Sequence, residues 1–366
     1  MSTTHAEQPE ARERSRTPRW RRYLSWGLSL VVVVGVFVFA IPQFADYAAV
    51  WDTMRSLTPI EVSTLVAATA FNLVTYWLAN MAALPGLTLG RAAIVTQTTT
   101  AVANSLPAGG AIAVGLTYQI QRSWGFSSSE IALYVAVTGL WNIFAKLALP
   151  IVSVAVLVIV GQSGGAYVVA AAIGVGVLTA AAGVLAAIFW KEELARRIGD
   201  RGGAILTRLR GVVKKPPVAD LGERAVRFRD DTVGLVRSRW LFLSIATVGS
   251  HLALFLVLLL ALRHVGVSEA DVSTAEALAV FAFGRLISAL PVTPGGLGVI
   301  ELGYIGGLRA AAGPDLAPQV VAAVLLFRVL TYGIQIPIGG LTYLAWRSTT
   351  QGATSRDERA NDPGTR

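Results

Sequence analysis

Long apolar stretches alternate with short polar ones along almost the whole chain. A run of about 20 apolar residues can cross the hydrocarbon core of a bilayer, which is about 30 Å thick, as an α-helix. Six uninterrupted stretches approach or exceed this length, and they lie at residues 23–41, 60–84, 130–160, 166–190, 240–262 and 317–346. The pattern predicts an all-α integral membrane protein with about six transmembrane helices.

Two further apolar stretches, at residues 91–122 and 272–309, are interrupted near their middle. The first interruption is Pro-Ala-Gly-Gly at 107–110, and the second runs from Pro291 to Gly296. Proline removes a backbone donor and glycine weakens a helix, so a break at membrane depth is tolerated only where protein or a polar cavity surrounds it. The arms beside each break have about 12 to 19 residues, roughly 18 to 28 Å of helix. These lengths favour two re-entrant hairpins over full spans.

The distribution of Lys and Arg predicts the orientation of these segments. If the N-terminus lies in the cytoplasm and each hairpin returns to the side it entered from, the inside segments hold 25 Lys and Arg residues and the outside segments hold three. The positive-inside rule therefore predicts a multi-pass protein of the inner (plasma) membrane with both termini in the cytoplasm. In this topology the two hairpins enter from opposite faces.

The opposite entry of the two hairpins predicts an inverted repeat. When Gly109-Gly110 is aligned with Gly295-Gly296, two pairs of like residues also coincide, which are Leu116 with Leu302 and Tyr118 with Tyr304. Inverted repeats place binding sites near the middle of the bilayer, where broken helices meet. The two breaks are therefore expected to surround a site.

Three polar regions flank or interrupt the membrane domain, which we place at residues 23–348. Residues 1–22 form a basic cytoplasmic tail, and the polar composition of residues 349–366 predicts a disordered tail. The segment 191–239 is predicted to be a cytoplasmic loop with 13 basic and seven acidic residues. Apolar positions in its second part have helical spacing, so it contains either a short amphipathic helix on the membrane surface or a solvated basic linker.

Composition agrees with a membrane protein and excludes several kinds of chemistry. Of the 366 residues, 54% are hydrophobic and 14% are charged, whereas about a quarter of the residues of a soluble domain are charged. The chain has no Cys and its three His residues are scattered, so thiol catalysis and a Cys/His metal cluster are excluded. We expect no cofactor. The net charge of +9 follows the membrane topology, so membrane lipids rather than nucleic acid are the expected partners, and a homo-oligomer is compatible with the sequence.

Four charged residues fall well inside apolar stretches, namely Lys146, Arg285, Glu301 and Arg328. Each costs about 2.5 to 3.5 kcal/mol at the centre of a membrane helix, so each is expected to face the protein interior and to have a partner. Arg285 and Glu301 lie at similar distances along the chain from the second break, so we predict a salt bridge between them. This salt bridge would fix the shape of the hairpin, and a functional role remains compatible with it. Three cations against one carboxylate leave an excess of positive charge, which predicts an anionic ligand.

Backbone groups and neutral side chains near the breaks extend this predicted site. The second arm of each hairpin begins at membrane depth, so its unpaired N–H groups attract anions. The glycines that would expose them are Gly109, Gly110, Gly295 and Gly296. Polar residues also cluster before the first break; most are explained by interhelical hydrogen bonds, and Asn104, beside the break, is a ligand candidate. His251 lies in a span and is either a proton-coupling group or a hydrogen-bonded buried histidine.

Three more polar residues share a helix face with a predicted site cation. Asn142 precedes Lys146 by four residues, so both are expected to face one cavity. Tyr332 and Gln335 follow Arg328 at helical spacing. They either share its face in the site or simply hydrogen-bond to that arginine.

The string Leu290-Pro-Val-Thr-Pro-Gly-Gly-Leu-Gly-Val-Ile-Glu301 resembles the signature of the lysylphosphatidylglycerol synthase transmembrane-region family, also called the flippase-like domain family. The resemblance in layout extends over most of residues 20–348. It marks Pro294, Gly295, Gly296, Gly298, Glu301 and Arg328. The resemblance implies a domain that moves lipids, such as aminoacylated phosphatidylglycerol or glycolipids, between leaflets.

The first half of the chain departs from the pattern of that family. Many members have a Pro-x-x-x-Gly-Glu motif there, whereas this chain reads Pro-Ala-Gly-Gly-Ala-Ile from Pro107 and has no carboxylate. The resemblance therefore does not identify the lipid. The aminoacyl-transferring part of the family's bifunctional proteins is a soluble C-terminal domain, and only residues 347–366 follow the last span here. We therefore expect the membrane part alone and no enzyme activity.

Three functions are compatible with the sequence. The leading hypothesis is a flippase-like protein that binds an anionic, aminoacylated or glycosylated lipid and translocates it between leaflets. The second is a small-anion or proton-coupled solute transporter, which substrate flux without lipid movement would indicate. The third is a non-transporting membrane scaffold that presents the basic segment 191–239 to a cytoplasmic partner, in which case deleting that segment abolishes function.

Overall fold

The computed structural model describes residues 46–106, 108–161, 176, 179–180, 183–184, 191–212, 220–289 and 293–360. Every regular element within these ranges is helical, which confirms the all-α class. The basic tail at 1–22, the predicted span at 23–41 and most of the predicted span at 166–190 lie outside the described residues. So do Pro107 and residues 290–292 of the two breaks.

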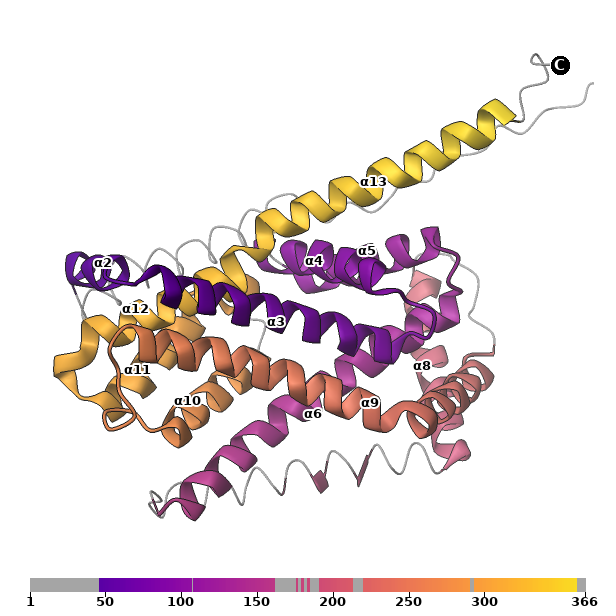
Figure 1. Ribbon diagram of the computed structural model, residues 1–366. Helices are drawn as coiled ribbons and strands as arrows, with labels where there is room; N and C mark the ends of the chain where they lie inside the picture. The colour runs from indigo at the N-terminus through magenta and orange to yellow at the C-terminus, as the bar shows by residue number, and fades with distance from the viewer. Residues whose placement is uncertain are drawn as a thin grey trace, which may run out of the picture.

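The described helices pack as a bundle (Figure 1). In chain order they are α2 (Tyr47–Arg55), α3 (Pro59–Ala83), α4 (Leu89–Ser105), α5 (Gly109–Ser123), α6 (Ser128–Ile159), α8 (Glu192–Val212), α9 (Leu221–His264), α10 (Thr274–Ile287), α11 (Val299–Ala312), α12 (Ala317–Arg328) and α13 (Gln335–Ala360). Four described stretches are long and apolar enough to cross a membrane, namely α3, α6, α9 and Pro314–Thr349. Helices α3 and α9 lie side by side through the bundle.

The starts of α3, α6 and α10 follow from a short sequence motif. Thr58, Ser127 and Ser273 each accept a hydrogen bond from the backbone of a Glu three residues later, and that Glu accepts one from the backbone of the first residue. This capping box satisfies two backbone donors that the start of a helix leaves unpaired. It therefore fixes where each of these helices begins.

The segment 191–239 is helical in its described parts, and its place on the cytoplasmic side stays a prediction. Helix α8 occupies its first part. Helix α9 begins at Leu221 and continues into the membrane span as one helix of 44 residues. Helices α8 and α9 pack closely. A Cβ added at Gly199 would lie only 2.6 Å from the Leu221 carbonyl oxygen. The amphipathic spacing after residue 220 thus belongs to the first turns of a transmembrane helix.

The last predicted span, at 317–346, lies within the candidate membrane span Pro314–Thr349, and its helix changes form near the middle. Helix α12 ends at Arg328, a π-helical turn follows at Val329–Gly333, and α13 continues to Ala360. The first residues of the predicted tail are therefore part of α13, which projects beyond the rest of the bundle (Figure 1). Such π-helical turns are frequent at functional sites. This one directly follows a predicted site cation.

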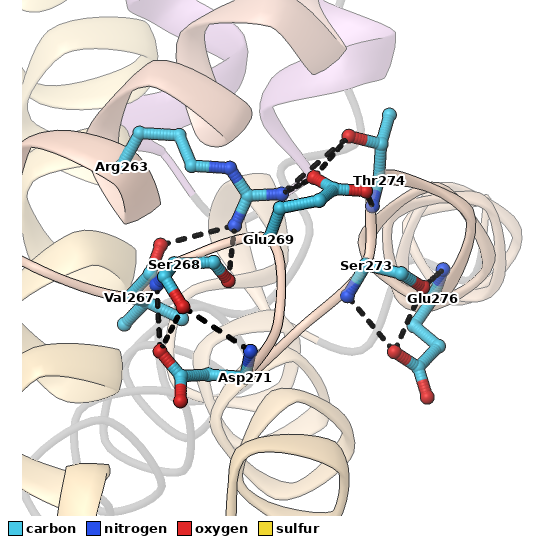
Figure 2. A network of polar contacts seen from close by, with 8 residues as sticks. All are labelled: Arg263, Val267, Ser268, Glu269, Asp271, Ser273, Thr274 and Glu276. Atoms are coloured by element: carbon cyan, nitrogen blue, oxygen red, sulfur yellow. Dashed lines mark hydrogen bonds and ion pairs between the residues drawn. The ribbon is translucent and has the colours of Figure 1, made fainter.

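The connection from α9 to α10 is held by a network of charged and hydroxyl groups (Figure 2). Arg263 forms an ion pair with Glu269, which accepts a hydrogen bond of 2.7 Å from the Thr274 backbone N–H. Asp271 accepts hydrogen bonds from the Ser268 backbone N–H at 2.8 Å and from the Ser268 hydroxyl at 2.5 Å. The Thr274 N–H lowers the pKa of Glu269, and the Ser268 hydroxyl lowers the pKa of Asp271. The network fixes the start of α10 relative to the end of α9.

The two largest clusters of buried apolar residues in the described part of the chain hold the bundle together. The larger joins α9, α10, α11 and α12 around an aromatic row, in which the Tyr304 ring stacks on Phe281 at 6.4 Å and meets Phe327 edge-on at 5.7 Å. The smaller joins α3, α4, α6 and α9 around Tyr134 and Leu243. Tyr304 and Phe327 line one polar cavity, and Tyr134 and Leu243 line a second. Each apolar cluster thus provides a wall of the site described next.

Candidate functional site

The first break is a tight turn between α4 and α5. Ala108 has a left-handed backbone conformation, with φ of 56°. A Cβ on Gly109 would lie 2.5 Å from the Val102 carbonyl oxygen, whereas a Cβ on Gly110 would meet nothing within 4 Å. Gly109 is therefore required for the close approach of α5 to the end of α4, and Gly110 is not.

The second break needs glycine for its backbone and meets the first break in space. Gly295, in the 3₁₀ turn Pro294–Gly296, has φ of 58°, and Gly298 has φ of 88°, conformations that disfavour other residues. A Cβ on Gly295 would overlap the Tyr332 ring and lie 3.1 Å from the Asn104 side-chain oxygen. The Tyr332 hydroxyl donates a hydrogen bond of 2.6 Å to the Asn104 backbone carbonyl. The end of α4, the second break and the π-helical turn thus converge.

A cavity of about 240 Å³ lies at this meeting point, and we call it the cationic cavity. Its lining includes seven residues singled out from the sequence, namely Lys146, Arg285, Arg328, Asn104, Gly295, Tyr332 and Gln335. They come from α4, α6, α10, α12, the second break, the π-helical turn and the start of α13. All three predicted cations therefore line one cavity, which agrees with the free-energy cost of exposing a charged side chain to lipid.

Glu301 and Arg328 form a fixed ion pair beside the cationic cavity. Arg328 Nε donates to Glu301 Oε1 at 2.6 Å, and Glu301 is only 1% exposed. The other carboxylate oxygen of Glu301 accepts the Gly298 N–H at 2.7 Å and so caps α11. Arg328 Nη2 donates to the Gly295 carbonyl at 3.2 Å, and the guanidinium carbon lies 4.4 Å from the centre of the Tyr332 ring. The pair therefore holds the second break in shape.

The predicted salt bridge between Arg285 and Glu301 is wrong. Glu301 pairs with Arg328 of α12, and Arg285 instead places Nη2 3.4 Å from the Tyr76 hydroxyl of α3. Arg285 Nε is buried without a hydrogen-bond partner in the described part of the chain. Neither Arg285 nor Lys146 forms an ion pair with a carboxylate among the described residues. The second break is irregular backbone, so equal distance from it along the chain does not bring two side chains together.

The glycines of the breaks contribute less to the cavity than predicted. Gly295 lines it, and the first backbone donor of α11 is taken by Glu301. The remaining glycines lie outside the lining, namely Gly109, Gly110, Gly296 and Gly298. The positive charge of the cavity therefore comes from side chains rather than from helix N-termini.

Asn142 and Lys146 line two neighbouring cavities rather than one, which corrects the prediction. Lys146 lines the cationic cavity, whereas Asn142 and His251 line a second cavity of about 360 Å³. His251 Nδ1 lies 3.0 Å from the Thr247 carbonyl oxygen, to which it donates a hydrogen bond. His251 is thus a hydrogen-bonded buried histidine, and its role in proton coupling stays a prediction.

Two residues of the cationic cavity were not predicted as ligands. Gln97 is 1% exposed, and neither its amide oxygen nor its amide nitrogen has a hydrogen-bond partner among the described residues. Its place in the polar run Thr-Gln-Thr-Thr-Thr was the available signal. Tyr76, which contacts Arg285, lies in the predicted span at 60–84, which contains no comparable run of polar residues.

A protein-family model matches most of the chain. The model is described as the lysylphosphatidylglycerol synthase TM region, and it matches residues 26–339. The matched range includes both breaks and every residue that lines the cationic cavity. No catalytic aminoacyltransferase domain is detected in the chain. Comparison with curated proteins finds no match.

Proposed function

The chain belongs to the lysylphosphatidylglycerol synthase transmembrane-region family, and on this premise we propose that it binds a lipid with an anionic head group in the cationic cavity and moves that lipid between leaflets. One observation carries the proposal. Lys146 and Arg285 line the same cavity, and neither pairs with a carboxylate among the described residues.

Two partly buried cations without a counter-charge favour an anionic ligand. Taking an ammonium or a guanidinium out of water costs several kcal/mol even after the protein relaxes. A phosphate group supplies negative charge and several acceptor oxygens, which suit both the fork of an arginine and the point charge of a lysine. A phosphate-bearing head group would therefore offset the cost of burying Lys146 and Arg285.

An apolar groove supports a lipid as the bearer of that phosphate. The groove has a volume of about 700 Å³ and is formed by α4, α5 and α13, with Leu106, Ile112, Leu116 and Ile336 in its lining. Leu106 is two residues from Asn104, which lines the cationic cavity, so the groove and the cavity flank the same end of α4. One lipid molecule could therefore place its head group in the cationic cavity and an acyl chain in the groove.

The proposal gives the site residues separate tasks. Lys146 and Arg285 bind the phosphate. The Arg328–Glu301 pair holds the second break and is already satisfied, so it positions the cavity wall rather than the ligand. The Gln97 amide, which has no partner among the described residues, donates to a head-group oxygen.

Translocation of head-group-labelled phosphatidylglycerol in proteoliposomes tests the proposal. Arg285→Ala removes one of the two unpaired cations and is expected to slow translocation at least about tenfold, the effect of roughly 1.4 kcal/mol. Arg237→Ala is the matched control, because Arg237 is an exposed residue of α9 outside the cavity. The control should move lipid at the wild-type rate. Wild-type rates in both Arg285→Ala and Glu301→Gln would contradict the site.

A small-anion transporter is the second candidate, and the volume of the cationic cavity is the observation that favours it. A cavity of about 240 Å³ has room for an inorganic anion without an attached acyl chain. Flux of phosphate into vesicles in which labelled lipid does not move, abolished by Arg285→Ala, would support this function over lipid translocation.

A further inference from the structure

The second cavity adjoins the cationic one and has a different chemistry. Its volume is about 360 Å³, and sites for small molecules are commonly about 300 to 1,000 Å³. Tyr76, Thr96 and Thr100 line both cavities, so the two touch along these side chains. We call the second one the neutral cavity.

The two cavities follow one another along the same helices. On α6, Asn142 lines the neutral cavity, and Lys146, one turn later, lines the cationic cavity. On α9, His251 lines the neutral cavity, and Leu254 lines the cationic one. If the phosphate of a ligand lies in the cationic cavity, the group attached to that phosphate can therefore reach the neutral cavity.

The neutral cavity is polar without being charged. No Asp, Glu, Lys or Arg lines it among the described residues. Its polar groups are the hydroxyls of several Thr residues, the amides of Asn80 and Asn142, and the rings of Tyr134, Trp141 and His251. Hydroxyl and amide groups both donate and accept hydrogen bonds. This lining suits a neutral group that carries several hydroxyls.

His251 gives an independent indication that the neutral cavity receives a ligand. The residue is 1% exposed, and because its Nδ1 donates to the Thr247 carbonyl at 3.0 Å, Nε2 of the neutral ring is left as an acceptor. Nε2 is buried and has no hydrogen-bond partner among the described residues. A buried polar atom without a partner destabilises the protein. A ligand hydroxyl that donates to Nε2 would remove this cost.

We infer that the neutral cavity holds the uncharged, hydroxyl-bearing part of the head group, a glycerol or a sugar, whose phosphate binds Lys146 and Arg285. The inference rests on the proposed function and narrows the substrate to anionic lipids with a neutral polyhydroxyl head group. An aminoacylated head group is disfavoured, since its ammonium would meet no carboxylate among the residues described around the neutral cavity. The adjoining cavity also already holds unpaired cations.

Competition among three probe lipids tests this inference. The full chain is reconstituted in nanodiscs with equal amounts of phosphatidylglycerol, lysyl-phosphatidylglycerol and phosphatidylmethanol, which share a singly charged phosphodiester and differ in the group attached to it. Native mass spectrometry then counts the bound lipids. Phosphatidylglycerol is expected to exceed phosphatidylmethanol about fivefold, as one added hydrogen bond provides, and the lysyl lipid at least about tenfold.

Two variants make the test specific to the neutral cavity. His251→Phe removes the unpaired acceptor and should bring the ratio of phosphatidylglycerol to phosphatidylmethanol closer to one. Asn142→Asp adds a carboxylate of nearly the same shape and should raise the lysyl lipid relative to phosphatidylglycerol. The lipid ratios measured for the wild-type protein are a test by themselves, because they do not depend on whether a variant folds.

The outcomes separate this inference from the proposed function. Equal retention of the three lipids by the wild type, or a preference for the lysyl lipid, would overturn the neutral-cavity inference and leave lipid binding in place. Ratios that neither folded variant changes would also overturn it. If the wild type neither retains nor translocates any of the three lipids, both the inference and the proposed function fail.

Discussion

The break before α5 and the break before α11 both interrupt an apolar stretch, but different interactions hold them. At the first, Gly109 packs against the backbone of α4, and the described residues of the turn carry no charge. At the second, Glu301 caps α11 and pairs with Arg328. The second break thus depends on an ion pair and on glycine backbone conformations, whereas the first depends on close packing.

This difference agrees with the departure of the first half from the family pattern. Residues 107–112 contain no carboxylate, so the first break lacks the residue type that anchors the second. It is attached to the second half instead, because the Tyr332 hydroxyl donates to the Asn104 carbonyl. The second half therefore organises the site, and the first half completes its wall.

The largest effect is expected from Glu301→Ala at the second break. The change leaves Arg328 without its partner and Gly298 without its cap, so the free energy of unfolding should fall by about 3 to 5 kcal/mol, as when a buried ion pair is broken. Denaturant unfolding in detergent measures it. The matched control is Glu192→Ala, which breaks the exposed Glu192–Arg196 pair of α8 and should cost only about 0.2 to 1 kcal/mol. Equal losses in the two variants would show that charge does not hold the second break.

At the first break, Gly109→Ala is expected to have a smaller effect through packing alone. The new Cβ would lie 2.5 Å from the Val102 carbonyl oxygen, which should lower the free energy of unfolding by about 1 to 3 kcal/mol. Gly110→Ala places its Cβ in open space and should stay within about 0.5 kcal/mol of wild type. Indistinguishable unfolding curves for the two variants would mean that the first break is not closely packed.

The contact between the two breaks is tested by Tyr332→Phe. Loss of the hydrogen bond to the Asn104 carbonyl should lower the free energy of unfolding by about 0.5 to 1.5 kcal/mol. Tyr118→Phe is the control, since the Tyr118 hydroxyl bonds to the Ser128 hydroxyl at an exposed position. A Tyr332→Phe protein as stable as the control would indicate that the two breaks are held independently.

The smallest effect is expected from pH at the two connections that precede the broken stretches, which are α3–α4 and α9–α10. Glu269 and Asp271 have pKa values below their usual 4.5 and 3.8, so their stabilisation of the α9–α10 connection is complete above those values and is lost as the pH falls through the lowered ones. Residues 84–88, which connect α3 to α4, contain no carboxylate. Hydrogen exchange, corrected for its intrinsic pH dependence, should show loss of protection below about pH 4 at 265–274 and not at 84–88. Equal loss of protection in both connections would show that Glu269 and Asp271 do not cause the pH dependence.

The sequence predicted which cations face the protein interior better than it predicted their partners. Lys146, Arg285 and Arg328 face one cavity because the cost of charge in a membrane drives each inward. The partner of Glu301 depends on how α12 and the second break pack, and spacing along the chain does not contain that information. The separation of Asn142 from Lys146 has the same origin, since Tyr76, Thr96 and Thr100 of other helices lie between the two cavities.

For the fold as well, the sequence predicted some features and not others. Apolar length identified α3, α6 and the membrane part of α9. It did not show that α9 begins at Leu221, because the charged residues there resemble a loop, although no proline interrupts the helix between residues 221 and 264. The π-helical turn Val329–Gly333 gave no signal either, since its Val-Leu-Thr-Tyr-Gly sequence also fits an uninterrupted span.

The central claim is that Lys146 and Arg285 form a site for an anionic head group, and native mass spectrometry of the protein purified with its bound lipids tests it most directly. We predict that the wild-type protein retains an anionic lipid, that a variant with both Lys146→Met and Arg285→Met retains none, and that the Arg237→Met control behaves as wild type. Retention of the same anionic lipid by the double variant, with thermal unfolding that shows it to be folded, would contradict the claim.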